Sequence, residues 1–269
     1  MTLLRAVLSP SMLRSFADGD LFGEIWGSVP PRVIALHGWR RTHADFTSVV
    51  GPGSTSGEYS ALALDLPGFG ASPPPPTAWG SADYAVLVAK TLEELSAPPI
   101  VVLGHSFGGR VGVHLAASRP DLVKGLVLTG APVARTDAPR RRPPLGFRLV
   151  RSLRRARLVP ERMLERSRRL HGSSDYLAAH GVVRQVLVRL LAEDYDDQIA
   201  RIHCPVELVW ADDDTEAPLA VGRKLAETIA GSTLTVCPGA GHMTPLTVPE
   251  CLRQAVDRAL EAPCGAATQ

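Results

Sequence analysis

A serine, a histidine and a run of aspartates carry the chemistry that this sequence suggests. Ser106 is the serine of a G-x-S-x-G pattern from Gly104 to Gly108, His242 lies in a glycine-rich loop, and Asp212–Asp214 are consecutive. A serine hydroxyl becomes a good nucleophile only when a neighbouring base takes its proton, and an imidazole has a suitable pKa near neutrality. An acid can then orient the imidazole and stabilise its charged form. These residue types predict nucleophilic catalysis.

The residues around Ser106 matter more than the motif, because a short glycine pattern is weak evidence alone. The apolar, mostly β-branched run Ile100–Leu103 predicts a buried strand, and Arg110–Ala117 predicts a packed helix. Ser106 would then occupy a strained strand-to-helix turn, a nucleophile elbow, where flanking side chains would collide. The start of the helix would aim the Phe107 N–H at a developing oxyanion. The alternative is an ordinary glycine-rich turn, as in a phosphate-binding loop.

The remaining pattern predicts the elements that must position these residues. Met12–Trp26 is typical of a hairpin around Asp18-Gly19-Asp20. Further strands are expected at 32–36, 60–64, 122–128, 206–210 and 233–236, and helices at 81–96, 219–229 and 249–260. Ser81 is expected to cap the first of these helices. Strands that alternate with helices indicate a mostly parallel sheet covered on both faces.

One segment interrupts this alternation. Residues 133–202 contain no convincing strand, and between Arg135 and Leu170 there are 13 arginines and three acids, a net charge of +10 in a chain of net charge +2. We expect an inserted helical cap over the edge of the sheet where open α/β sheets bind ligands. Its arginines form either a solvated outer face or a surface that attracts an anionic substrate or membrane.

With these pieces assembled, the chain resembles the α/β-hydrolase-fold enzymes of the cap-bearing esterase type. The resemblance rests on pieces that span nearly the whole chain outside the cap: His37-Gly38-Trp39, Asp65–Ser72, Gly104–Gly109, the loop after Trp210 and Gly239-Ala240-Gly241-His242. It implies an α/β-hydrolase fold, with a mostly parallel twisted sheet, helices on both faces and an inserted cap. The expected organisation is a core at 1–132 and 203–269, a cap at 133–202 and a loose tail from about 261.

The resemblance also implies roles for single residues. It implies the chain order nucleophile, acid, histidine, hence Ser106, Asp214 and His242 as a triad. Asp214 fits the family register because Ala211 precedes it by three positions and Pro218 follows it by four. Asp213 is the next candidate. The alternative for Asp212 and Asp213 is that they form a solvated acidic loop. The backbone N–H of Trp39 is implied as the second oxyanion donor beside that of Phe107, whereas Asp65 is expected to tie down its own loop.

The predicted function is that of a serine hydrolase that cleaves an ester, thioester or lactone through an acyl-enzyme. The alternatives are a C–C bond hydrolase, an amidase, an acyltransferase or a ligand-binding protein on the same fold. No cofactor or metal is expected, because the four cysteines lack metal-ligand spacing and no dinucleotide or phosphate loop occurs. We expect a cytoplasmic protein with a small acyl substrate, without nucleic-acid binding or stable membrane insertion; the sequence leaves the oligomeric state open.

Overall fold

The computed structural model describes residues 13–54, 60–136, 160, 163 and 174–263. The chain divides into two compact units. The first comprises Met1–Pro74, Gly80–Thr136 and Asp194–Gln269, and the second comprises Pro75–Trp79 and Asp137–Glu193. Every residue that the sequence marks as a site candidate belongs to the first unit.

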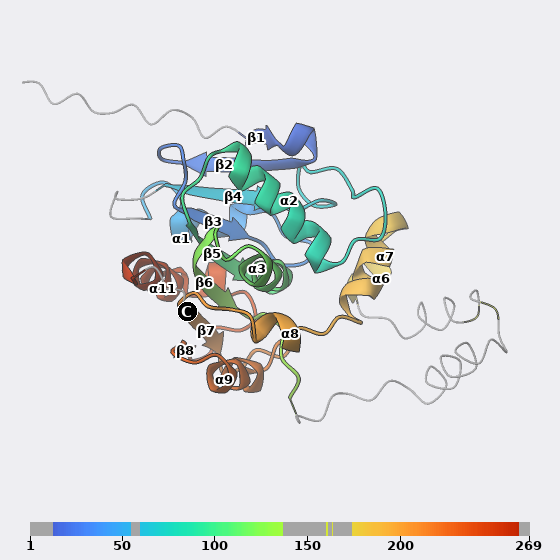
Figure 1. Cartoon of the computed structure of the whole chain (residues 1–269). Helices are drawn as coiled ribbons and strands as arrows, with labels where there is room; N and C mark the ends of the chain where they lie inside the picture. The colour runs from blue at the N-terminus through green and yellow to red at the C-terminus, as the bar shows by residue number, and fades with distance from the viewer. Residues whose placement is uncertain (1–12, 55–59, 137–159, 161–162, 164–173, 264–269) are drawn as a thin grey trace, which may run out of the picture. The chain divides into compact units, whose positions relative to one another are not determined.

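The first unit is built on an eight-stranded sheet with the strand order β1-β2-β4-β3-β5-β6-β7-β8 (Figure 1). The strands are β1 (Leu13–Phe16), β2 (Leu21–Trp26), β3 (Val33–Leu36), β4 (Ala61–Asp65), β5 (Ile100–His105), β6 (Val123–Thr129), β7 (Val206–Ala211) and β8 (Thr233–Cys237). β1 and β2 form the predicted hairpin, and β2 pairs antiparallel with β4. All later pairings are parallel, which confirms the predicted mostly parallel sheet.

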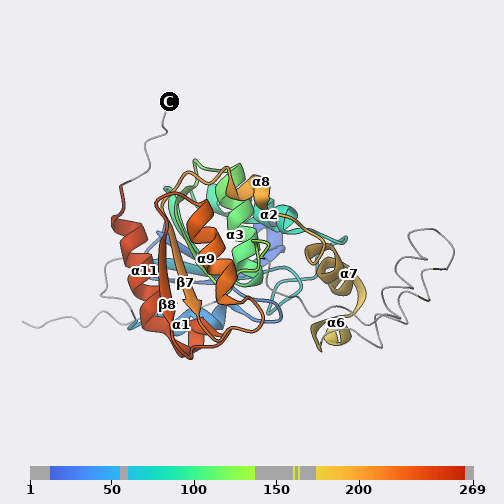
Figure 2. The same cartoon turned by 90° about the horizontal axis from the view of Figure 1, so that it is seen from below.

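Helices cover both faces of this sheet, as Figure 2 shows. One face carries α2 (Ser81–Glu94), α3 (Phe107–Ser118) and α9 (Leu219–Thr228), with α8 (Asp196–Ile199) against α3. The other face carries α1 (Thr47–Val50) and α11 (Pro249–Glu261), which contact each other. Three short elements complete the unit: the 3-10 turns η1 (Ala17–Gly19) and η2 (His43–Phe46), and α10 (Thr244–Thr247).

The core follows from the alternation of side chains along each buried strand. Val33 and Ala35 of β3 belong to one cluster with Leu252 and Val256 of α11. Along the opposite face, α3 lies so close to β3, β5 and β6 that a Cβ atom added to Gly108 would meet Leu36, and one added to Gly112 would meet Val102 and Leu126. Burial of each such aliphatic side chain is worth about 1.5–3 kcal/mol. Because both faces are buried, the central strands read as continuous apolar runs.

The start of α2 differs from the sequence prediction. Gly80, not Ser81, is the residue before the helix, and its N–H donates to the Asp83 carboxylate at 2.7 Å. The Ser81 side chain is instead fully buried, with its hydroxyl 3.2 Å from the hydroxyl of Tyr195. Ser81 was therefore the wrong choice of cap, because a distant hydroxyl became its partner when the chain folded.

The second unit contains α6 (Ser174–Ala178) and α7 (Gly181–Leu190). Within it, the Arg189 guanidinium donates to the carbonyl of Ala78 at 2.7 Å. Most of the arginine-rich run from 135 to 170 lies outside the described residues. Its one described arginine, Arg135, belongs to the first unit and forms an ion pair with Asp194. In the described part of the chain, no helix combines the length and the apolar character needed to span a membrane.

Candidate active site

Ser106 lies on the sharp turn between β5 and α3, with φ 49° and ψ −108°. An L-residue with positive φ is strained by about 1–3 kcal/mol, so the surrounding structure must hold it there. The Ser106 N–H donates to the carbonyl of Thr129 at 2.9 Å. A Cβ atom on Gly108 would lie 2.0 Å from the carbonyl oxygen of Leu36, and one on Gly104 would lie 2.6 Å from the Gly109 Cα. The predicted strand–turn–helix context is therefore present, and both flanking glycines are required by close packing.

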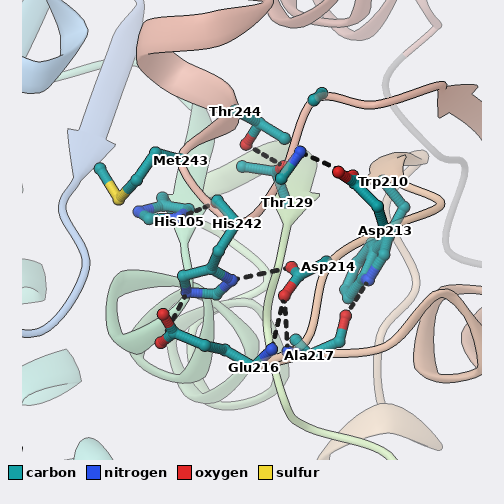
Figure 3. Close-up of polar contacts among 12 residues, drawn as sticks. His105, Thr129, Trp210, Asp213, Asp214, Glu216, Ala217, His242, Met243 and Thr244 are labelled. Atoms are coloured by element: carbon teal, nitrogen blue, oxygen red, sulfur yellow. Dashed lines mark hydrogen bonds and ion pairs between the residues drawn. The ribbon is translucent and has the colours of Figure 1, made fainter.

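His242 and Asp214 form a buried pair (Figure 3). The Nδ1 atom of His242 lies 2.8 Å from Oδ2 of Asp214, and their side chains are 12% and 1% exposed. The other carboxylate oxygen accepts the N–H groups of Glu216 at 2.8 Å and Ala217 at 2.9 Å. Both carboxylate oxygens are thus satisfied although the group is buried. The hydrogen bond to Nδ1 therefore fixes the orientation of the imidazole ring.

Residues next to Ser106 in the chain and in the sheet contact His242 and Asp214. His105, the last residue of β5, donates from Nε2 to the carbonyl of His242 at 2.9 Å, and the two rings are 4.9 Å apart. Gly130 follows β6, and a Cβ atom there would lie 3.0 Å from Cε1 of His242 and 3.2 Å from Oδ2 of Asp214. Since β5 and β6 are parallel and paired up to His105 and Thr129, Ser106 and Gly130 leave the sheet at the same edge.

The two other aspartates bind the loop that carries His242. Asp212 accepts the N–H of Gly239 at 2.9 Å, and Asp213 accepts the N–H of Gly241 at 2.8 Å. They are exposed, as a solvated acidic loop would be, but each holds a backbone group of the histidine loop. The sequence pattern did not predict this role. The signal was present in the glycines before His242, which leave backbone N–H groups accessible to a neighbouring turn.

The loop after β3, which carries Trp39, passes beside Ser106 at Gly38. A Cβ atom on Gly38 would lie 3.5 Å from the Ser106 Cβ. Phe107 is the first residue of α3, where helix N–H groups lack partners within the helix. The backbone hydrogen bonds of turns, loops and helix caps in the described residues include none donated by the N–H of Trp39 or of Phe107. The two rings also pack edge to face, with centroids 5.6 Å apart.

Two buried histidines fasten these loops. His37 donates from Nδ1 to the Gly38 carbonyl at 2.7 Å and accepts the Leu66 N–H on Nε2 at 2.9 Å. Burial lowers the pKa of His37 to about 4. Burial, reinforced by the neighbouring His242, also lowers the pKa of His105 to about 4. Both rings are therefore neutral at pH 7, and each can accept as well as donate a hydrogen bond.

These two histidines predict that the fold loses stability in mild acid. Their pKa falls from 6.5 to about 4 on folding, so the unfolded chain binds more protons between those pH values. The unfolding free energy is therefore unaffected by these two rings above pH 6.5. It falls as the pH drops towards 4, by up to roughly 3 kcal/mol for each ring. His43 opposes this trend, because its hydrogen bond with Asp65 raises its pKa.

Chemical unfolding followed from pH 7.5 to 4.5 measures this effect. We expect His105→Gln to flatten the decline, whereas the same change at His203, which is exposed, should leave it unchanged. An unfolding free energy that stays constant over this range for the unaltered protein would contradict the prediction.

Comparisons with known proteins agree with the fold. Residues 33–250 match the model of the alpha/beta hydrolase family. The chain is 31% identical over 240 residues to the pimeloyl-(acyl-carrier protein) methyl ester esterase of Chromobacterium violaceum, which covers 83% of this chain and 91% of that protein. It is 27% identical to a 2-hydroxy-6-oxononadienedioate/2-hydroxy-6-oxononatrienedioate hydrolase of Cupriavidus pinatubonensis, over 80% and 82% of the two chains.

A solved structure shows the same fold. The esterase of Exiguobacterium antarcticum has a TM-score of 0.71 at 22% identity and covers 94% of this chain and 100% of its own. The family match extends over most of the sheet and over the candidate site residues from Trp39 to His242. The chain therefore belongs to the alpha/beta hydrolase family and is a hydrolase.

Proposed function

We propose that this hydrolase cleaves a carboxylic ester, thioester or lactone through an acyl-enzyme intermediate. The Ser106 hydroxyl attacks the acyl carbon while Nε2 of His242 takes its proton. Asp214 accepts the Nδ1–H hydrogen bond, which selects the tautomer and stabilises the imidazolium. The imidazolium then protonates the leaving group, and the acyl group stays on Ser106. Water, deprotonated by the same histidine, attacks this ester and releases the acid.

The negative charge that develops on the acyl oxygen needs donors that already point at it. In this proposal the backbone N–H groups of Trp39 and Phe107 supply them. Phe107 starts α3 and Trp39 lies in the loop after β3, so regular elements hold both donors beside Ser106. Loss of a single donor of this type costs about 10²–10³ in kcat.

The observation that carries the proposal is the buried His242–Asp214 hydrogen bond at the sheet edge where Ser106 turns out of β5. This pair is not a surface ion pair, because the Asp214 side chain is 1% exposed. The named activity of the Chromobacterium violaceum relative, a methyl ester esterase, supports ester bonds as the substrate class. No cofactor enters the reaction as proposed.

A labelling experiment tests the acyl-enzyme directly. We expect the purified protein to hydrolyse short p-nitrophenyl esters and to react with a fluorophosphonate at one site per chain. Peptide mass analysis should place the phosphonyl group on Ser106, and labelling should remove turnover in the same proportion. Heat-denatured protein serves as the control, because an unfolded serine has no base beside it.

Each other outcome has a definite meaning. Label on a different serine, or turnover that survives complete labelling, contradicts Ser106 as the nucleophile. The protein could also be labelled on Ser106 and turn over matched amides or a C–C substrate, but no ester. In that case the proposed substrate class is wrong, and the acyl-enzyme mechanism stands. A series of acyl chain lengths in the same assay then defines the acyl preference.

A further inference from the structure

Glu216 brings a second carboxylate to His242. Its Oε2 atom lies 3.5 Å from Nε2 of His242, on the opposite side of the ring from Asp214 (Figure 3). The Glu216 N–H donates to Asp214 at 2.8 Å, so the same turn fixes the backbone of one acid and the side chain of the other. The Glu216 side chain is 66% exposed, whereas that of Asp214 is 1% exposed. The two carboxylates therefore differ in role, since one is enclosed and the other faces solvent.

The position of Glu216 matters because of what Nε2 does in the proposed reaction. Nε2 receives the serine proton and passes it to the leaving group, so the leaving-group atom must come within about 3.2 Å of it. Since Oε2 is 3.5 Å from Nε2, the leaving-group atom can then be no farther than about 7 Å from that oxygen. Every leaving group that His242 protonates thus passes close to this carboxylate.

His105, Asp213 and Asp214, which lie around the imidazole, bring no positive charge to it. The pKa of His105, lowered to about 4 by burial, leaves that ring uncharged at pH 7. Asp213 and Asp214 are acidic as well, and each is bonded to backbone N–H groups or to Nδ1. The charge that this turn presents towards Nε2 is therefore negative.

We propose that Glu216 is a specificity-determining residue that favours esters whose leaving group carries a positive charge, such as the esters of quaternary amino alcohols. The inference rests on the proposed function of His242. Because the side chain is exposed, it can rotate to let the substrate approach while its charge stays near the leaving group. The same charge disfavours anionic leaving groups. This is the opposite of the anion attraction considered for the arginine-rich segment.

A matched pair of substrates tests this proposal. A choline ester and the 3,3-dimethylbutyl ester of the same acid have nearly the same shape, but only the first has a cationic leaving group. The acyl group is the one that gives the fastest turnover in the p-nitrophenyl series. We expect kcat/KM to favour the choline ester by about three- to tenfold at low salt, as for charges about 7–10 Å apart near a protein surface. Added salt should reduce this ratio.

Glu216→Gln keeps the size of the side chain and removes its charge. We expect this variant to lose the preference, so that kcat/KM for the choline ester falls relative to that for the neutral ester. Glu227→Gln, which makes the same change in the last turn of α9, should keep the wild-type ratio. An equal ratio in the wild type and in Glu216→Gln, with both esters hydrolysed, overturns the role of Glu216 and leaves the proposed function standing. Turnover of the p-nitrophenyl ester without turnover of either alkyl ester also overturns the role of Glu216, whereas turnover of no ester at all overturns the proposed function.

Discussion

Replacement of Ser106 by alanine should abolish ester turnover and leave the fold intact. The hydroxyl is the only group that the change removes, and the proposed acyl-enzyme cannot form without it. In serine hydrolases of this kind, loss of the nucleophile lowers kcat by about 10⁴–10⁶. Alanine has the same Cβ atom as serine, so it meets the same backbone strain at φ 49°. We therefore expect little change in the unfolding free energy.

Turnover of a p-nitrophenyl ester and thermal unfolding, measured on the same preparation, check both halves of this expectation. Ser118→Ala is a matched control, because it removes a hydroxyl from the exposed end of α3. It should retain full activity. If Ser106→Ala keeps more than a few per cent of the wild-type rate, with contamination excluded, Ser106 is not the nucleophile.

Replacement of Asp214 by asparagine should lower kcat by roughly 10⁴. Asp214 accepts hydrogen bonds from Glu216 N–H, Ala217 N–H and Nδ1 of His242. In the variant, the amide oxygen can still accept the two backbone groups, which leaves the NH₂ group facing Nδ1. The imidazole must then place its proton on Nε2, where it cannot take the serine proton. The loss should appear in kcat more than in KM.

Asp213→Asn is the control for this change, because it lies one residue away on the same turn. Its amide oxygen can still accept the Gly241 N–H that Asp213 accepts at 2.8 Å, so the histidine loop keeps its anchor. We expect a loss of less than about tenfold, since a neutral acceptor replaces a charged one. A larger loss at Asp213 than at Asp214 would move the proposed acid by one position.

The sequence was most informative where a local pattern alone decides the structure. The apolar run Ile100–Leu103 forms β5 because a strand buried on both faces tolerates only such side chains. The glycines around Ser106 predicted a close packing that exists, since a Cβ atom on Gly108 would meet the backbone of Leu36. Such features depend on residues that are near one another in the chain, and so they can be recognised from composition and spacing.

Prediction was less complete where the partner of a polar group lies far away in the chain. Ser81 looked like a helix cap, but its hydroxyl meets Tyr195, 114 residues later. Asp212 and Asp213 looked like a solvated acidic loop, but they hold Gly239 and Gly241. A short polar side chain has many possible acceptors and donors, and spacing in the sequence does not rank them.

By itself, the sequence determined the alternation of strands and helices, the elbow at Ser106 and a short set of candidates for the acid and the base. Among the three aspartates, the resemblance to the family favoured Asp214, but the residue types alone could not, because Asp212, Asp213 and Asp214 have the same chemistry; the tertiary structure shows that Asp214 is the one that meets His242. It also decided that Glu216 lies at Nε2. The physical reason is that a hydrogen bond requires its two atoms within about 3 Å and in line, and β7 and β8 set that geometry together.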